Sequence, residues 1–293
     1  MTTTSSALLD VRELTKRRKG FALEGISLAV EPGQIVGLVG ANGSGKTTLM
    51  KCIFGALRCD AGSIRLLGED ATKGACPNSK DQLGVVHDTC PYPPELKVKE
   101  IVGLLSCAFT QWNSNEYNRF MRLFNLDGSK KIKQLSRGMG MMLQLAVALS
   151  HSPKLLLLDE ATAGLDPLVR DEVLDIVANY VAEHDAGALL ATHITTDLEH
   201  ISDWVVCLNN GRMIFGCDRD SITDLAGIAR CSAADVEEIA KADLGTLYLE
   251  RRSYNCNILV PDRFVFAEFF PKVACDRCSV EDYMRLTMKG ERL

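Results

Sequence analysis

The sequence has no long apolar run and no block of basic residues. No hydrophobic stretch approaches the roughly 18 to 20 residues that a helix needs to cross a bilayer. The opening residues, Met1 to Ser6, lack the basic start and apolar middle of a secretory signal, so we expect a cytoplasmic chain. The formal net charge is −5 and the basic residues are scattered, which argues against nucleic acid as a partner.

Cysteine, by contrast, is plentiful, with 11 residues in the chain. Most stand alone among apolar neighbours, which is typical of reduced thiols that fill a core. One pair, Cys275 and Cys278, has the spacing of a zinc or redox site. No second pair accompanies it, so a structural role is the favoured interpretation and a zinc or redox site the alternative.

The distribution of apolar residues predicts an α/β fold. Alternating apolar and polar residues between Leu8 and Val30 indicate two antiparallel strands. Three short apolar runs follow at Ile35–Val39, Leu155–Leu158 and Ala188–Ala191, each leading into polar or glycine-rich residues and then an amphipathic segment. Repetition of buried strand and helix indicates a largely parallel sheet covered by helices.

Two regions depart from this rhythm. About residues 92–140 are mostly helical and indicate an inserted helical subdomain. Beyond residue 219 the alternation weakens, so we predict one domain over residues 1–219 and a small accessory domain over residues 220–293. Between them, Asn210-Gly211 has the composition of a two-residue hairpin turn.

A glycine-rich segment follows the first apolar run and opens a helix. Its residues, together with the next threonine, are Gly40, Ala41, Asn42, Gly43, Ser44, Gly45, Lys46, Thr47 and Thr48. In such a loop, backbone N–H groups and the helix N-terminus surround phosphate oxygens, Lys46 reaches the β and γ phosphates, and the Thr47 hydroxyl binds Mg²⁺. A glycine-rich turn that binds nothing is the alternative, but all fixed positions of the motif are present.

Acidic residues end the second apolar run. Asp159 is expected to hold Mg²⁺, and Glu160, one residue further, to polarise the water that attacks the γ phosphate. Two carboxylates at the end of a buried strand need such a reason, because an unpaired buried charge is costly. His193 ends the third run and is expected to sense or stabilise the γ phosphate from the same edge of the sheet.

Two further segments resemble motifs of the ATP-binding cassette (ABC) ATPases. Leu135-Ser136-Arg137-Gly138-Met139 is similar to the LSGGQ signature, and Ala163-Gly164-Leu165-Asp166 to the D-loop. The resemblance covers about residues 8–217. It implies a P-loop ABC ATPase fold with a mainly parallel core sheet, an N-terminal antiparallel β subdomain, an inserted helical subdomain and a C-terminal α+β appendix. It also implies a sandwich dimer in which Ser136 and the Gly138 backbone close over the partner subunit's ATP.

The sequence departs from the family pattern around the nucleotide. Where the family's Q-loop carries glutamine, this chain has Asp88, a hard oxygen ligand that can reach Mg²⁺ through water. Arg18 stands where an adenine-stacking aromatic is expected, with Phe21 three residues on, and a guanidinium can also stack on a base. In the signature, Arg137 and Met139 replace glycine and glutamine, as in bacterial exporter-type ATPases encoded apart from their permeases.

The resemblance implies an ATP-hydrolysing subunit, with ATP and Mg²⁺ bound, that energises a separate transmembrane permease, for export. We expect a second ABC ATPase subunit as partner, identical or paralogous, at the inner face of the membrane. The alternative is a soluble ABC ATPase with a regulatory or mechanical role. A small-molecule kinase is disfavoured by the signature and the D-loop.

Overall fold

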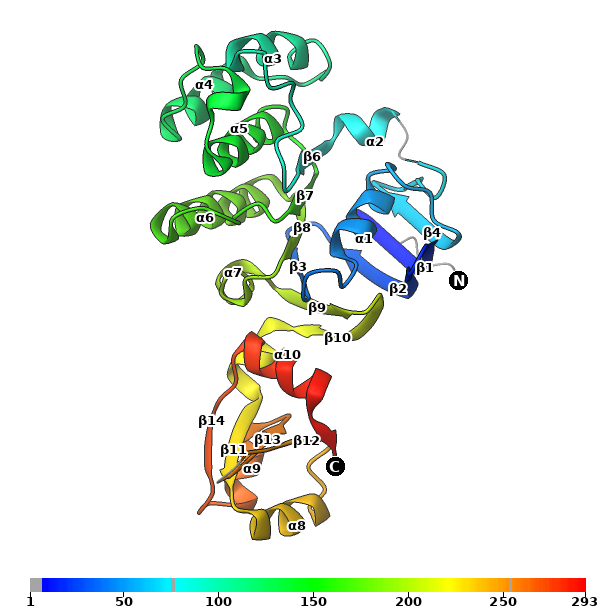
Figure 1. The fold of residues 1–293 in the computed structure, drawn as a ribbon, viewed down its shortest axis with the longest axis vertical. Coiled ribbons are helices and arrows are strands. Elements are labelled where there is room, and N and C mark those ends of the chain that lie inside the picture. Colours follow the sequence, from blue (N-terminus) through cyan, green and yellow to red (C-terminus); the bar gives the residue numbers. More distant parts are fainter. Residues whose placement is uncertain (1–6, 75–76, 253–254) are drawn as a thin grey trace.

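Three β-sheets and a helical region make up the structure, a computed structural model that describes residues 7–74, 77–252 and 255–293. Residues Met1 to Ser6, on which the expected lack of a secretory signal depends, lie outside these ranges. Figure 1 shows helices α3, α4 and α5 at one end, two sheets in the middle and the C-terminal residues at the other end. None of the helices in the described ranges is both long and apolar enough to span a bilayer.

The central sheet has six strands, and all neighbours except β10 and β9 run parallel. This confirms the mainly parallel core sheet. In spatial order the strands are β10 (Arg212–Asp218), β9 (Trp204–Asn209), β3 (Ile35–Val39), β8 (Gly187–Thr192), β7 (Leu155–Asp159) and β6 (Leu83–Val86).

The four leucines of β7 explain why the core strands are apolar throughout. Successive side chains of a strand point to opposite faces. Leu155 and Leu157 therefore pack in the apolar cluster on one face of the sheet, while Leu156 and Leu158 pack in the cluster on the other. With both faces covered, no position in the strand meets water, so alternation disappears from the sequence.

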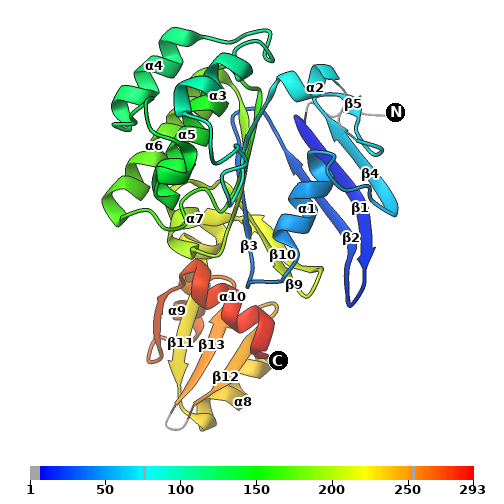
Figure 2. The same cartoon turned by 45° about the horizontal axis from the view of Figure 1, so that its top comes forward.

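One face of the central sheet is covered by helix α1 (Lys46–Ile53) and an antiparallel sheet beyond it. Leu49 and Met50 of α1 are fully buried between the two sheets. Figure 2 shows the same arrangement, with α1 between β3 and β2. The antiparallel sheet confirms the predicted N-terminal β subdomain and has the order β2 (Phe21–Val30), β1 (Leu9–Arg18), β4 (Ala61–Leu66) and β5 (Glu69–Asp70).

Helices cover the other face. Buried residues of α5 (Arg137–Leu149), α6 (Pro167–His184) and α7 (Thr195–Ile201) share one apolar cluster with β3, β7 and β8. The predicted helical subdomain projects from this layer as helices α3 (Val98–Leu105) and α4 (Ser114–Leu123) and a short 3-10 turn, η1 (Ile132–Gln134). A short helix, α2 (Pro77–Asp81), precedes β6.

The predicted hairpin turn joins β9 to β10. Asn210 and Gly211 have φ values of 47° and 77°, the left-handed pair that a two-residue hairpin requires. A Cβ on Gly211 would lie 1.7 Å from the carbonyl oxygen of Ala22, so only glycine fits there. The Gly211 N–H also donates to the Ser44 carbonyl at 3.0 Å, which ties the turn to the glycine-rich loop.

Residues beyond 219 form a third, antiparallel sheet with its own apolar cluster around Phe266. Ser232 and Ser279 cap helices α8 and α10, and each accepts a hydrogen bond from the backbone of an aspartate three residues on. The elements are η2 (Ser221–Leu225), β11 (Gly227–Cys231), α8 (Ala233–Lys241), β12 (Tyr248–Arg251), β13 (Cys256–Val260), α9 (Arg263–Phe269), β14 (Ala274–Arg277), α10 (Val280–Lys289) and β15 (Glu291–Arg292).

The boundary near residue 220 stays a prediction. Ile222 and Val280 belong to the apolar cluster of the central sheet rather than to the C-terminal one. Helix α10 lies between the C-terminal sheet and β10 (Figure 1), so the accessory residues are packed against the main core.

Candidate nucleotide site

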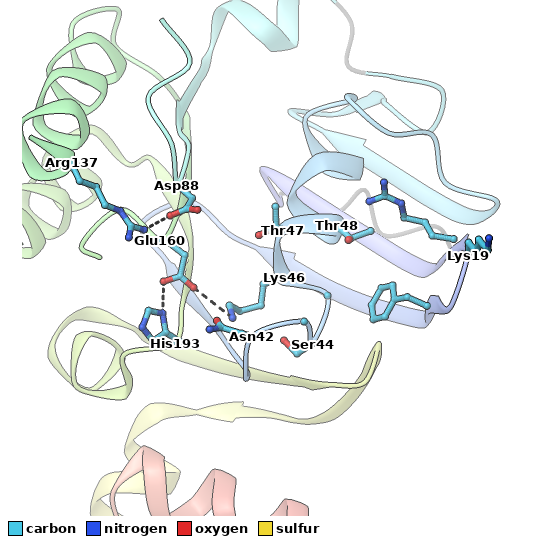
Figure 3. A pocket seen from close by; sticks show the side chains of 14 residues that line it. Lys19, Asn42, Ser44, Lys46, Thr47, Thr48, Asp88, Arg137, Glu160 and His193 are labelled. Atoms are coloured by element: carbon cyan, nitrogen blue, oxygen red, sulfur yellow. Dashed lines mark hydrogen bonds and ion pairs between the residues drawn. The ribbon is translucent and has the colours of Figure 1, made fainter. Parts of the chain in front are cut away.

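A pocket of about 780 Å³ lies where β3 ends and α1 begins (Figure 3). Its wall is built from the turn after β1, the glycine-rich loop, the ends of β6 and β7, and the segment after β8. The lining residues are Arg18, Lys19, Phe21, Asn42, Gly43, Ser44, Gly45, Lys46, Thr47, Thr48, Asp88, Arg137, Glu160 and His193.

The glycine-rich loop has the geometry of an anion cradle. Gly45 caps α1 with φ of 116°, a conformation that L side chains rarely adopt, and a Cβ there would meet Leu23 at 2.5 Å. Ser44 is buried, and its hydroxyl has no hydrogen-bond partner among the described residues. An orphaned buried hydroxyl next to a helix N-terminus fits a phosphate oxygen.

Lys46 is held in position by contacts with the glycine-rich loop and with Glu160. Its ammonium group donates to the Gly40 carbonyl at 2.7 Å and lies 3.6 Å from Glu160 Oε1. Its side chain is almost fully buried. Gly40 and Ala41 do not line the pocket; the Gly40 carbonyl anchors the lysine, and the Ala41 carbonyl accepts from the Ser44 N–H.

Thr47, which lines the pocket, and Asp159, which does not, supply two neighbouring oxygen groups that fit Mg²⁺. The Thr47 hydroxyl donates to Asp159 Oδ1 at 3.4 Å, which brings together the hard ligands that the sequence predicts. Burial raises the pKa of the Asp159 carboxyl, and the Thr47 hydrogen bond opposes that rise. In the described ranges no three His, Cys, Asp or Glu residues cluster as a metal site.

Glu160 is positioned by a strained backbone. Its φ of 55° is unusual for a residue other than glycine and costs of order 1–3 kcal/mol. The Glu160 N–H donates to the Ala191 carbonyl at 2.8 Å. In this orientation Oε2 lies 2.7 Å from His193 Nδ1. Figure 3 shows the carboxylate between His193 and Lys46 of the phosphate loop.

Asp88 also faces the pocket, but Arg137 holds its carboxylate in an ion pair (Figure 3). Both residues replace the residue type that the family pattern carries, and sequence alone did not indicate that they meet. Ser136 and Gly138 do not line this pocket. Ser136 caps α5 by accepting from the Met139 N–H at 3.2 Å, and its side chain faces a neighbouring cavity with Arg137.

The part of the pocket wall formed by the turn between β1 and β2 is basic. Arg18, Lys19 and Phe21 line it; contact of Arg18 and Phe21 with the base stays a prediction. Sequence reasoning missed Lys19, although it directly follows Arg18 in the turn between β1 and β2. It also missed Gln144, whose side chain bonds the backbone of His87, and Asp197, which accepts from the Thr162 hydroxyl just before the D-loop segment.

The fold and this pocket define a P-loop nucleotide hydrolase. A family model described as "ABC transporter" matches residues 23–163. The Nod factor export ATP-binding protein I of Cupriavidus pinatubonensis is 31% identical over 252 residues, which cover 82% of this chain and 75% of the relative. The chain therefore belongs to the ABC transporter ATP-binding proteins, and it is an ATP-binding ATPase of that family.

Solved structures agree with this assignment. One titled "Structure of ATP binding subunit of ABC transporter" is 30% identical, with a TM-score of 0.66, and the match covers 73% of this chain and 91% of that one. A second, the dimeric cassette MJ0796 in a post-hydrolysis state bound to ADP and Pi, is 19% identical with a TM-score of 0.64. That match covers 72% of this chain and 98% of the cassette, and it supports the fold alone.

Proposed function

We propose that this chain is the ATPase subunit of an ABC exporter and works at the inner face of the membrane with a permease on a separate polypeptide. One observation carries the hydrolytic part of the proposal. The Glu160 carboxylate lies between Lys46 and His193, with one oxygen 3.6 Å from the ammonium and the other 2.7 Å from the imidazole. The export direction is supported by the name of the relative from Cupriavidus pinatubonensis, which describes an export protein.

The motif residues in and around the pocket then have defined tasks. Lys46 and the loop N–H groups bind the phosphates, and the Ser44 hydroxyl adds a donor. Glu160 accepts a proton from the attacking water, while His193 orients the carboxylate and stabilises the γ phosphate. Thr47, Asp159 and, through water, Asp88 would hold Mg²⁺, which would supply positive charge to the phosphate oxygens.

Two copies of the site are needed for turnover. Ser136 and the backbone of Gly138 lie outside their own subunit's phosphate pocket, at the exposed N-terminus of α5. A helix N-terminus carries partial positive charge and free N–H groups, so it can close over the γ phosphate held by a second subunit. The partner is another copy of this chain or a paralogue, and closure of the pair reports that ATP is bound.

The permease is expected to dock on the helical subdomain and the Asp88 corner. Helices α3 and α4 project away from the central sheet (Figure 1), and Asp88 lies where β6 leaves it. Movement of the permease at this surface would therefore displace Asp88, a residue of the nucleotide pocket.

Arg18 and Lys19, in the turn between β1 and β2, would contact the base, and the Arg18 guanidinium can stack on it.

Copurification tests this proposal. The chain, tagged and expressed in its own host, is isolated from detergent-solubilised membranes, and bound proteins are identified by mass spectrometry. We expect a polypeptide with several membrane-spanning helices, in constant ratio to the chain, and ATP hydrolysis by the complex. Recovery of an active chain from the soluble fraction alone, with no membrane protein, would favour the regulatory or mechanical alternative.

A further inference from the structure

The side chain of Gln144 is bonded to the backbone at the end of β6. Its Oε1 accepts from the His87 N–H at 2.9 Å, and its Nε2 donates to the His87 carbonyl at 3.1 Å. Gln144 lies in the middle of α5 and is only 1% exposed. The oxygen and the nitrogen of this buried amide are therefore both hydrogen-bonded to one residue, which is 57 positions away in sequence.

The hydrogen bonds between Gln144 and His87 lie at the edge of the central sheet, where a further strand would otherwise pair. β6 is the last strand in the order and, among the strands of the described residues, pairs with β7 alone, through Val86 at its end. His87, the next residue, finds in the Gln144 amide the same donor and acceptor that another peptide group would supply. The oxygen and nitrogen positions follow from the bonding, because an N–H needs an acceptor and a carbonyl needs a donor.

The same corner is held from two further sides. The His87 ring packs edge-on against Phe54, at the end of the phosphate-binding helix α1, with ring centroids 5.3 Å apart. The Asp88 carboxylate is paired with Arg137 at the start of α5. His87 and Asp88 thus lie between the helix that starts at the phosphate cradle and the helix that starts at the signature serine.

We propose that Gln144 is a positioning residue that fixes the backbone at His87 so that Asp88 reaches the metal of bound Mg-ATP. The inference rests on the proposed function of Asp88. Aspartate is one methylene shorter than the glutamine of the family pattern, so a displaced backbone cannot be corrected by extending the side chain. A fixed backbone is therefore a stricter requirement here than with the longer residue.

The same bonds join α5 to the coupling corner. Rotation of α5, which carries Ser136 at its N-terminus, moves the Gln144 amide, and with it the peptide groups on both sides of His87. Closure of the signature over the partner subunit's nucleotide is in this way transmitted to Asp88 of the same chain. Gln144 acts through Asp88 and does not itself contact the pocket.

The test uses Gln144→Met, which removes both hydrogen bonds at similar volume, and Gln144→Glu, which keeps only the acceptor. The Mg²⁺ concentration for half-maximal ATP hydrolysis is measured with the purified full chain, beside ATP binding without Mg²⁺. We expect the Mg²⁺ requirement of Gln144→Met to rise about tenfold, as for other residues that orient a metal ligand. Gln144→Glu should lie between it and the parent, and metal-free ATP binding should change little in both.

Val147→Ala is the matched control, because Val147 is buried on the same helix and contributes only its side-chain volume to the apolar cluster. It should lower the melting temperature without altering the Mg²⁺ requirement. Gln144→Met is also made in an Asp88→Ala background, which alone should weaken Mg²⁺-dependent hydrolysis more than ATP binding. If Gln144 acts through Asp88, its substitution has no further effect on the Mg²⁺ requirement there.

Three outcomes distinguish the role proposed for Gln144 from the proposed ATPase function on which it rests. An unchanged Mg²⁺ requirement in Gln144→Met, or an equal rise in both backgrounds, overturns the role of Gln144 while leaving the ATPase intact. An unchanged requirement in Asp88→Ala rejects Asp88 as a metal contact, and the inference with it. A parent chain that does not hydrolyse ATP in any assembly overturns the proposed function itself.

Discussion

Glu160 and His193 are separated by 33 residues, yet Oε2 of the carboxylate and Nδ1 of the imidazole lie 2.7 Å apart. The contact arises because β7 and β8 are parallel neighbours whose carboxyl ends meet at one edge of the sheet. Lys46 approaches the other carboxylate oxygen from the phosphate loop. Glu160, His193 and Lys46 are therefore brought together at the carboxyl end of the central sheet.

Glu160→Gln should abolish turnover while preserving ATP binding. An amide matches the carboxylate in size but cannot accept a proton from water, so phosphate release should fall at least about a hundredfold. ATP titration should give nearly the parental affinity, and gel filtration with ATP should show a trapped dimer. Hydrolysis at the parental rate in this variant would mean that another group activates the water.

Mixing two inactive variants should restore activity if the sites are shared between subunits. Lys46→Ala lacks the ammonium group of the phosphate cradle and Ser136→Glu places a negative charge at the signature, so each homodimer has two defective sites. A mixed dimer has one site that combines the intact cradle of one chain with the intact signature of the other. Phosphate release from the separate and mixed proteins measures this, and a mixture as inactive as its components would exclude sharing.

Phe266→Ala should destabilise the C-terminal residues strongly. Phe266 is fully buried and stacks on Phe270 with ring centroids 5.2 Å apart. Loss of a buried aromatic side chain costs about 3–5 kcal/mol. Phe269→Ala on the same helix is the control, because Phe269 is 61% exposed and its loss should change the free energy of unfolding by about 0.5 kcal/mol or less.

Urea unfolding followed by circular dichroism distinguishes these two variants. It also tests the proposed division of the chain. If residues 220–293 form a separate unit, Phe266→Ala should shift an early transition and leave ATP binding by the main core intact. A single transition that shifts as a whole would show that the two parts unfold together.

Glu250 should make the stability of the C-terminal sheet depend on pH. The Arg285 hydrogen bond lowers the pKa of the Glu250 carboxyl, and Arg252 and Asn257 act in the same direction. The pKa of Glu250 is lower in the folded chain than in the unfolded chain, so its ionised carboxylate stabilises the fold above the unfolded pKa, near 4.5. This stabilisation is lost as pH falls through the folded pKa.

Glu250→Gln should therefore cost about 1 kcal/mol at pH 7, since the pair is partly exposed, and progressively less as pH falls below about 4. Urea midpoints of parent and variant, compared across that range, measure the difference. Glu268→Gln, on the exposed face of α9, is the control for removal of one carboxylate outside this cluster of hydrogen bonds. If the difference in urea midpoint between Glu250→Gln and the parent stays constant with pH, the pKa of Glu250 is not lowered in the folded chain.

Much of the nucleotide site could be predicted because its information is local. The segment from Gly40 to Thr47 is recognised from the spacing of its own residues, and Asp159-Glu160 from its position directly after a run of leucines. The strands of the central sheet were also evident, since burial on both faces leaves continuous apolar runs. These features depend on near neighbours in sequence, where side-chain type and spacing fix the outcome.

The contacts between distant segments could not be predicted. Nothing in the residues around Gln144 indicates that its amide bonds His87, and the pairing of Arg137 with Asp88 depends on how α5 docks on β6. The strand order β14-β11-β13-β12-β15 likewise separates β11 from β12 and β13 from β14, which follow one another in sequence. Such relationships arise from tertiary packing, which one sequence does not encode in any short pattern.

Helix α10 also has a practical consequence for expression. Tyr283 packs edge-on against Phe215 with ring centroids 4.9 Å apart, and Met288 lies 3.9 Å from the sulfur of Cys207. A fragment that stops at residue 219 would lack α10, so apolar side chains of β9 and β10 would be exposed to solvent. Such a truncated product would aggregate unless Phe215 and its neighbours were exchanged for hydrophilic side chains.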